Sequence, residues 1–322
     1  MPVHCEDRRT NRWALETLDE LIPQGNDPNN DRVEIVPAVA LWREQQKKED
    51  LPGWLADSRL QFQQFPLEML FWQNTVYKLR IPPQEELVES GYTHAWLFHT
   101  PIVNSPRMLE YYLEEVAQNS DHFHVDNGEY FESIEEMCEK AKSLGCDTLI
   151  NCTGLGSATV CPDEDSLVGG RGVTLRFDRK TATRRSSLYQ SQYGEIDEAT
   201  AKDAVVMTSD QPWARDETMP CYLIPRGDIL VVGGTMLKGD TETGIRENEE
   251  RALLENAHRL GIDTETVSPV HQWTGFRPYR PAVRCEIDEQ CSNDIKVLHN
   301  YGHGGSGWTI NIGTAKECVD LL

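Results

Sequence analysis

The sequence lacks the short motifs of several common enzyme classes. Its 322 residues contain no Gly-x-Ser-x-Gly, no His-Glu-x-x-His and no P-loop, so the usual hydrolase and kinase chemistries have no support. The nine cysteines form no Cys-x-x-Cys pair, a spacing typical of structural zinc sites. The odd count favours reduced thiols over a disulfide framework, and structural zinc is not expected.

Long apolar runs and basic stretches are also missing. No segment approaches about 18 consecutive apolar residues, and residues 1–13 have neither the basic nor the apolar region of a secretory signal. The 31 lysines and arginines are outnumbered by 53 aspartates and glutamates, which gives a net charge of −22. Because such a chain repels phosphate backbones and anionic lipids, we expect no nucleic acid and no membrane as partners. The missing apolar run and secretory signal lead us to expect an intracellular location.

What is present is the balance of a soluble globular protein, with 39% hydrophobic and 26% charged residues. Hydrophobic periodicity predicts helices over 10–25, 104–118, 133–145, 246–261 and 309–322. Short apolar runs predict strands over 32–42, 92–103, 122–127, 147–152, 172–178, 204–209, 221–225, 228–234 and 295–300. Units of α/β type in the middle and at the end therefore enclose β-rich segments, which indicates a discontinuous two-domain α/β protein.

Two of the predicted helices carry terminal signals. Thr10 or Asn11 is a suitable N-cap for the first helix, and Pro23 is expected to stop it. Ser133 and Glu136 have the spacing of a capping box, so a helix is expected to begin directly after Ser133.

A glycine-rich turn near the end of the sequence contains a literal G-x-G-x-x-G at Gly302, Gly304 and Gly307. A strand, a glycine turn and a helix N-terminus suit a diphosphate or an electron-rich ring. A dinucleotide fold also needs an acidic residue about 20 positions later, and only 15 residues follow Gly307. The dinucleotide interpretation therefore fails, and a tight structural crossing and a ligand-binding loop stay open.

A second glycine turn, "LINCTGLGS" at 149–157, also follows a predicted strand. Here Thr153 is free to donate to a phosphate or a ribose, although a purely structural turn is the commoner explanation for such a motif taken alone. Parallel strands of one sheet bring their carboxyl ends to the same edge, where ligands bind. The two turns together therefore indicate a ligand site more strongly than either alone.

Three arginines, Arg277, Arg280 and Arg284, lie among prolines and aromatics in "WTGFRPYRPAVR". Arg277, held between Phe276 and Pro278 in a stiff segment of an acidic chain, is positioned either to pair with an internal carboxylate or to hold a substrate carboxylate in a bidentate manner. Tyr222 begins a predicted hairpin and is expected in the core, where its hydroxyl needs a partner.

His122, His124 and Asp126 fall on one face of a predicted strand with a metal-like spacing. No further ligand is evident, so we interpret them as a solvent-facing strand surface and expect no metal.

Several stretches, taken in order, resemble the D-amino-acid oxidase family, flavoproteins that include the D-aspartate oxidases. The blocks "TGFRP" and "HNYGHGG" are highly specific to it, and weaker similarity in "WALETLDELI" and "AWLFHTPIV" extends the resemblance over nearly the whole chain. The supporting stretches are "LINCTGLGS", "GGRGVTLRFD", "CYLIPRGDILVVGGTMLKGD", "TGFRPYRPAVR" and "VLHNYGHGGSGWTINIGTA".

The resemblance implies FAD-dependent oxidation of a D-amino acid by oxygen to a 2-oxo acid, ammonia and hydrogen peroxide, in which FAD carries the chemistry and the protein orients the reactants. It implies that Arg277 clamps the substrate carboxylate, that Tyr222 hydrogen-bonds the same group, and that the Gly305 carbonyl receives the amine. The residues implied to bind FAD are Thr153, Gly154, Leu155, Gly304, Ser306, Gly307 and Thr309.

The same resemblance implies a two-domain flavoprotein oxidase fold. An FAD-binding domain with a partial Rossmann-like sheet is expected from residues 1–24, 118–170 and 268–322. An antiparallel, β-rich substrate domain is expected from residues 25–117 and 171–267. A homodimer is compatible with the family, and the location is expected to be the cytoplasm or the peroxisome, although the end of the sequence carries no peroxisomal tripeptide.

The sequence also departs from the family pattern. The family's first strand, glycine turn and helix are not found before the first predicted helix, so the alternative to an oxidase is an inactive, N-terminally truncated remnant that does not hold FAD. Thr218 stands where many relatives have a second active-site tyrosine. Met236 stands where the D-aspartate branch has an arginine, which favours neutral or undetermined D-amino acids as substrates.

Overall fold

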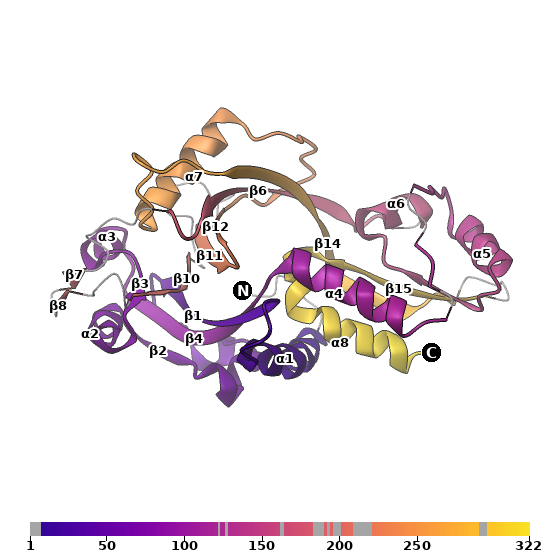
Figure 1. The fold of residues 1–322 in the computed structure, drawn as a ribbon, viewed down its shortest axis with the longest axis horizontal. Coiled ribbons are helices and arrows are strands. Elements are labelled where there is room, and N and C mark those ends of the chain that lie inside the picture. Colours follow the sequence, from indigo (N-terminus) through magenta and orange to yellow (C-terminus); the bar gives the residue numbers. More distant parts are fainter. Residues whose placement is uncertain are drawn as a thin grey trace.

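The computed structural model describes residues 8–121, 123–125, 128–161, 164–182, 190–191, 194–195, 201–208, 221–289 and 295–322 (Figure 1). Its helices are α1 Thr10–Asn26, α2 Leu67–Tyr77, α3 Gln84–Glu89, α4 Ser105–Gln118, α5 Ile134–Ser143, α6 Ser157–Val160, α7 Glu247–Arg259 and α8 Gly307–Asp320. Shorter 3-10 turns are η1 Lys48–Asp50, η2 Gly53–Ala56, η3 Ser58–Leu60, η4 Gly154–Gly156 and η6 Gly304–Ser306.

One large sheet organises the fold. Its strands are β1 Val33–Trp42, β2 Gln63–Pro66, β4 His94–Val103, β5 Thr148–Asn151, β6 Val168–Asp178, β10 Val205–Thr208, β11 Tyr222–Arg226, β12 Ile229–Gly233, β13 Leu237–Lys238, β14 His271–Ile287 and β15 Lys296–His303. They follow the order β2-β4-β1-β10-β11-β12-β6-β14-β15-β5, with β13 also paired to β6. The short pairs β3 Leu79–Arg80 with β9 Lys202–Asp203, and β7 Gln190–Ser191 with β8 Gly194–Glu195, lie outside it.

The sheet is mostly antiparallel, and the α/β class expected from the sequence is confirmed. Only the pairs β1–β10 and β15–β5 of the large sheet are parallel. The long strands β6 and β14 run from the upper part of the molecule to the part that holds β15, α5 and α6 (Figure 1). The expected domain boundary at 170/171 falls inside β6, and the division into two domains stays a prediction.

The two faces of β6 have different surroundings. Side chains of a strand alternate between the faces of a sheet, and here Val173, Leu175 and Phe177 are fully buried in one core with Leu253 and Ala257 of α7. The residues between them, such as Thr174 and Arg176, therefore face the other side of the sheet. That second side carries a large cavity.

Helices α1 and α8 pack closely because α8 carries a glycine at the crossing. A Cβ at Gly313 would lie 2.3 Å from the Cα of Trp13, so any larger residue would push the helices apart. The Gly313 amide donates to Thr17 Oγ1 at 3.2 Å. This contact fixes α8, and with it the glycine turn from which α8 begins.

Local signals predicted most elements but not all of their ends. Ser133 caps α5 as expected, since its hydroxyl accepts from the amide of Glu136 at 3.2 Å. The expected stop at Pro23 is wrong: α1 continues to Asn26, with Arg9 as an N-cap that makes no side-chain bond. A proline in the last turn removes only one donor, which the helix tolerates there.

The strand expected over 122–127 is also wrong for the residues that the structure describes there, because Phe123–Val125 are irregular. His124 is exposed, while His122 and Asp126 lie outside the described residues. Among the described residues no group of three His, Cys, Asp or Glu side chains is arranged to hold a metal ion.

Candidate active site

A cavity of about 770 Å³ lies against the face of the sheet that carries Thr174 and Arg176. Strands β4, β6, β10, β11 and β14 and helices α1, α4 and α8 contribute to its wall. Three residues singled out from the sequence, Arg277, Tyr222 and Thr309, line it together. They come from three separate elements. The fold therefore brings together side chains that are far apart in the sequence, since Tyr222 and Thr309 are separated by 87 positions (309 minus 222).

Arg277 lies flat against the sheet because a neighbouring strand has a glycine beneath it. In the register of β14 with β6, Arg277 pairs with Gly170, and its guanidinium extends over Gly172. A Cβ at Gly172 would lie 1.9 Å from Arg277 Nη1. Nη1 donates to the carbonyl of Thr235 at 3.0 Å, and no carboxylate of the described residues forms an ion pair with this arginine.

Tyr222 reaches the same place from β11. It pairs with Gly233 of β12, and a Cβ on that glycine would lie 2.2 Å from the tyrosine hydroxyl, so only glycine leaves room for the ring. Burial raises the pKa of Tyr222, and the nearby Arg277 guanidinium opposes that rise. The hydroxyl is therefore protonated at neutral pH and, with Arg277, offers donors to one anion.

The glycine turn η6 lies beside Arg277, although Gly304, Gly305 and Ser306 are not among the residues that line the cavity. Gly304 has φ +55° and sits against Tyr279, where its built Cβ would be 3.4 Å from the ring. A Cβ on Gly305 would lie 3.7 Å from Arg277 Cδ, so Gly305 lies beside the arginine side chain. Around Gly307 no atom lies within 4 Å of a built Cβ, which leaves open space at the N-terminus of α8.

The second glycine turn, η4, meets the first one at β14. Gly154 has φ +59°, and a Cβ built on it would lie 3.8 Å from the Pro278 ring, while a Cβ built on Gly169 would lie 3.6 Å from Leu155. Pro278 and Tyr279, which flank the two turns, directly follow Arg277. The expectation that both turns share one edge of the sheet is thus confirmed, because β5 and β15 are parallel neighbours.

The expectation that Thr153 is free to donate is wrong. Its hydroxyl donates to Asn151 Oδ1 at 2.7 Å and lies 2.9 Å from the hydroxyl of Ser157. Its amide also donates to Asn151 Oδ1, at 3.1 Å. The side chain stabilises the turn, and only the turn's backbone is left for a ligand.

These residues fit the ring end of a flavin. A glycine-rich turn lets a flat ring approach the backbone, and the buried Ser306 leaves that approach clear. Thr309 and Trp308 line the adjoining cavity at the first turn of α8, where the helix N-terminus favours electron-rich atoms.

Arg280 and Arg284 have structural partners instead. Arg280 Nε donates to Glu164 at 2.9 Å, and Arg284 Nη1 donates to the hydroxyl of Tyr301 at 2.8 Å. That hydroxyl donates in turn to Glu164 at 2.7 Å. Burial would raise the pKa of Glu164, but the hydrogen bonds from Arg280, Tyr301 and Ser166 lower it to about 2. Of the three sequence-predicted arginines, Arg277 alone is left for a ligand.

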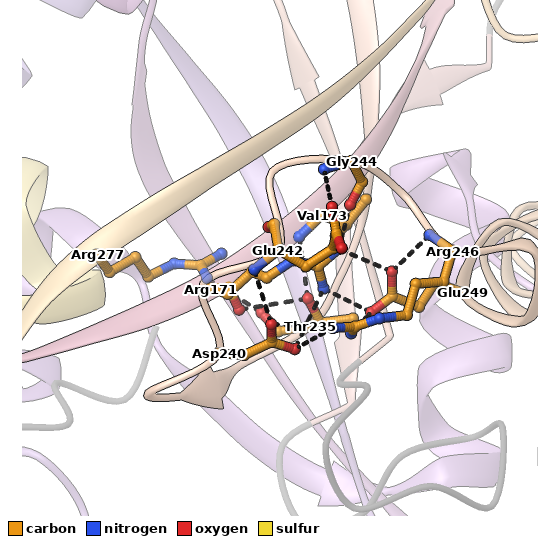
Figure 2. A network of polar contacts seen from close by, with 9 residues as sticks. All are labelled: Arg171, Val173, Thr235, Asp240, Glu242, Gly244, Arg246, Glu249 and Arg277. Atoms are coloured by element: carbon orange, nitrogen blue, oxygen red, sulfur yellow. Dashed lines mark hydrogen bonds and ion pairs between the residues drawn. The ribbon is translucent and has the colours of Figure 1, made fainter.

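A buried ion network lies behind Arg277 (Figure 2). Arg171 is fully buried, and its two terminal nitrogens contact the carboxylate of Glu249 at 2.6 and 2.9 Å. Arg171 also donates to the carbonyl of Gly244. Arg246 adds contacts to Glu249 at 3.1 Å and to Asp240 at 2.7 Å. The network fastens the segment between β12 and α7 to β6.

Thr235 connects this network to the cavity. Its hydroxyl accepts from the amide of Val173 at 3.0 Å and donates to the carbonyl of Arg171 at 3.3 Å. Both bonds fix the Thr235 carbonyl, which receives Arg277 Nη1 (Figure 2). Sequence reasoning missed Thr235 together with Gly172 and Gly233, although glycines inside strands signal a close approach by another group.

Comparison with known proteins agrees with this arrangement. Residues 4–321 match the family described as FAD dependent oxidoreductase. The chain belongs to that family. This confirms the resemblance drawn from the sequence blocks around Gly154, Arg277 and Gly304.

The chain is similar to D-amino-acid oxidase of Rubrobacter xylanophilus, with 26% identity over 254 residues that cover 78% of this chain and 66% of the relative. It is also similar to human D-aspartate oxidase, with 26% identity over 81% of this chain and 67% of the relative. The chain spans about half to two thirds of the length of the curated relatives it matches.

Solved structures share the fold of this chain. Glycine oxidase from Geobacillus kaustophilus superposes with a TM-score of 0.63 at 15% identity, over 97% of this chain and 77% of that protein. The flavoprotein oxidase fold expected from the sequence is therefore confirmed. Thr218, which stands where many relatives have a tyrosine, lies outside the described residues.

No helix of the described residues is long and apolar enough to cross a membrane.

Proposed function

We propose that the protein catalyses FAD-dependent oxidation of D-amino acids to 2-oxo acids, with release of ammonia and hydrogen peroxide. The observation that carries the proposal is Arg277, a cavity arginine without a carboxylate partner among the described residues, placed beside Tyr222 and Gly305. A guanidinium held by a neutral carbonyl keeps its full charge for a ligand. The family and its relatives support an amino-acid substrate.

Arg277 and Tyr222 bind the substrate α-carboxylate in this proposal. The guanidinium presents two parallel N–H donors, and the tyrosine hydroxyl adds a third. The Gly305 carbonyl accepts a hydrogen bond from the substrate amine. Three contacts to two groups on Cα fix which face of Cα points toward η6, and such orientation is the protein's main contribution to catalysis.

A bound FAD would supply the redox chemistry, as the acceptor for a hydride from the substrate Cα and the donor of electrons to oxygen. The backbone of η6 and Thr309 would hold its ring, and the backbone at Thr153, Gly154 and Leu155 would hold a more distant part. None of these residues is an acid or a base, so the site works through positioning and exclusion of water.

A visible spectrum of the purified full chain with added FAD tests the proposal. We expect a protein-bound flavin band that bleaches when a D-amino acid is added under nitrogen, and no bleaching with the L-enantiomer. A chain that stays colourless after removal of free FAD supports the alternative, a remnant that does not hold FAD.

Arg277→Leu isolates the carboxylate contact. We expect at least a hundredfold loss in kcat/KM, because a charge-assisted pair contributes about 3 kcal/mol, while FAD binding is retained. Arg251→Leu is the matched control, since Arg251 is exposed on α7 across the sheet from the cavity. Kinetics of Arg277→Leu equal to those of the control would refute the assigned role.

A further inference from the structure

Two more arginines line the cavity, and neither has a counterion among the described residues. The charged side chains of its described lining are Arg176, Arg226 and Arg277, and no aspartate or glutamate is among them. The chain as a whole has 53 acidic and 31 basic residues. A cavity lined by three arginines and no carboxylate therefore has the opposite sign of charge to the whole chain. Unpaired charges in a partly buried place are costly, so a ligand is their natural partner.

The sheet register places Arg176 and Arg226 near one another. Strand β12 lies between Arg226 of β11 and Arg176 of β6. Its Ile229 pairs with Arg226, and its Val231 pairs with Arg176. Ile229 and Val231 are two residues apart, so both arginines lie on the same face of the sheet. Two interstrand spacings and an offset of two residues along the strands amount to about 12 Å between backbones, a gap that two arginine side chains can close around one anion.

Contacts around the pair confirm that its charge is uncompensated among the described residues. Arg176 lies over the ring of Trp273, with Cζ 5.6 Å from the ring centroid, and its Nε is buried without a hydrogen-bond partner. Burial lowers the pKa of Arg176. Burial, and then repulsion from Arg176, lowers the pKa of Arg226. Neither pKa is raised by a carboxylate, in contrast to that of Arg179, which Glu34 raises.

The pair is offset from Arg277 along the strands. The Arg277 guanidinium lies over Gly172, and Arg176 is four residues further along β6, about 13 Å at the backbone. Part of this distance is taken up by the arginine side chains. A molecule that contacts both ends therefore carries two anionic groups several bonds apart.

We propose that Arg176 and Arg226 form a second anion subsite, which selects D-amino acids whose side chain ends in a carboxylate or another anion. The inference rests on the proposed function, because it assumes that Arg277 holds the α-carboxylate. It reverses the expectation drawn from Met236: the cationic residues that recognise the side chain come from β6 and β11, not from the position after Thr235.

Calorimetric titration of the full chain without FAD tests the subsite independently of turnover. The probes are glutarate, which has two carboxylates, and pentanoate, which has the same number of carbons and one carboxylate. We expect glutarate to bind at least tenfold more tightly. Arg176→Met and Arg226→Met should each weaken glutarate about tenfold or more and leave pentanoate unchanged, since a charge-assisted contact is worth about that factor.

The controls separate the two proposals. Arg277→Met should weaken both probes, and Arg251→Met neither. If glutarate and pentanoate bind equally and Arg176→Met changes nothing while Arg277→Met weakens both, the subsite is refuted and the proposed function stands. If Arg277→Met has no effect on either probe, the assumed position of the α-carboxylate is wrong and both fail.

Thermal unfolding gives a readout that needs no ligand. Removal of an uncompensated cation should raise the Tm of Arg176→Met above that of the parent chain, because the charge is held for binding at the expense of stability. A lower Tm for Arg176→Met, with unchanged glutarate binding, would indicate a structural role and overturn the proposal.

Discussion

Replacement of Glu249 by glutamine removes one charge from the network behind Arg277 and keeps the shape of the side chain. Arg171, which is fully buried, contacts both oxygens of Glu249. The same carboxylate accepts from the amide of Arg246 at 2.9 Å. After the change, Arg171 keeps its charge but loses the nearest anion.

The cost follows from the burial of the remaining charge. Breaking a buried ion pair by neutralising one partner typically costs about 3–5 kcal/mol. Asp240 is a second, weaker partner, with Oδ2 at 3.9 Å from Arg171 Nη1, so we expect the lower end of the range, about 3 kcal/mol. Arg246 keeps its own contact with Asp240 and does not add to the loss.

Urea unfolding followed by circular dichroism measures this loss directly. Glu255→Gln is the control, because Glu255 is an exposed residue of the same helix, and its change should stay within about 0.5 kcal/mol. Burial would raise the pKa of Glu249, but the contacts with Arg171 and Arg246 hold it below the usual 4.5. A lowered folded-state pKa gives stability that is present above pH 4.5 and lost as pH falls through the folded pKa.

The gap between parent and variant should therefore be widest at neutral pH and shrink below pH 4.5. Carboxylate binding should weaken as well, because Thr235 loses its fixed position. Equal stability of Glu249→Gln and Glu255→Gln at pH 7 would refute the view that this network holds the segment after β12 in place.

Three further changes probe the cavity and its rim. Gly172→Ala should weaken pentanoate binding at least tenfold in calorimetry with little loss of stability, because a Cβ 1.9 Å from Arg277 Nη1 displaces that side chain; unchanged affinity would show that the guanidinium does not lie there. Tyr222→Phe should weaken the same ligand about fivefold, the value of one hydrogen bond of about 1 kcal/mol, and a neutral result would remove the hydroxyl from the site. Burial lowers the pKa of His303 from 6.5 to about 4. The free energy of unfolding of the parent chain should therefore fall by on the order of 2 kcal/mol between pH 6.5 and 4, because the unfolded chain takes up the proton first. His303→Gln should flatten that part of the stability profile.

Local sequence signals were sufficient where an element depends on its own residues. The strand β4, the cap at Ser133 and the glycine turn before α8 were predictable from an apolar run, a capping box and a G-x-G pattern, respectively. The end of α1 was not, because packing of α1 against α8 and β1 maintains the helix through Pro23.

The site was predictable only in part, because most of it depends on strand register. Family resemblance indicated Arg277 and Tyr222, yet it did not indicate which of three arginines in one segment lacks an internal partner. That distinction rests on Glu164, which is 116 positions before Arg280 in the sequence. Arg176 and Arg226 likewise face the cavity only because β6, β12 and β11 pair in one particular register.

The ladder between β6 and β14 also limits how the cavity can open. It is continuous from the pair of His271 with Arg176 to the pair of Tyr279 with Val168, so backbone hydrogen bonds cross the region where a hinge between two rigid halves would have to bend. Hinges form at a few residues that are free to change φ and ψ, and this stretch offers none. We therefore expect ligands to enter and leave by rearrangement of side chains and loops at the cavity mouth, while the sheet itself stays rigid throughout turnover.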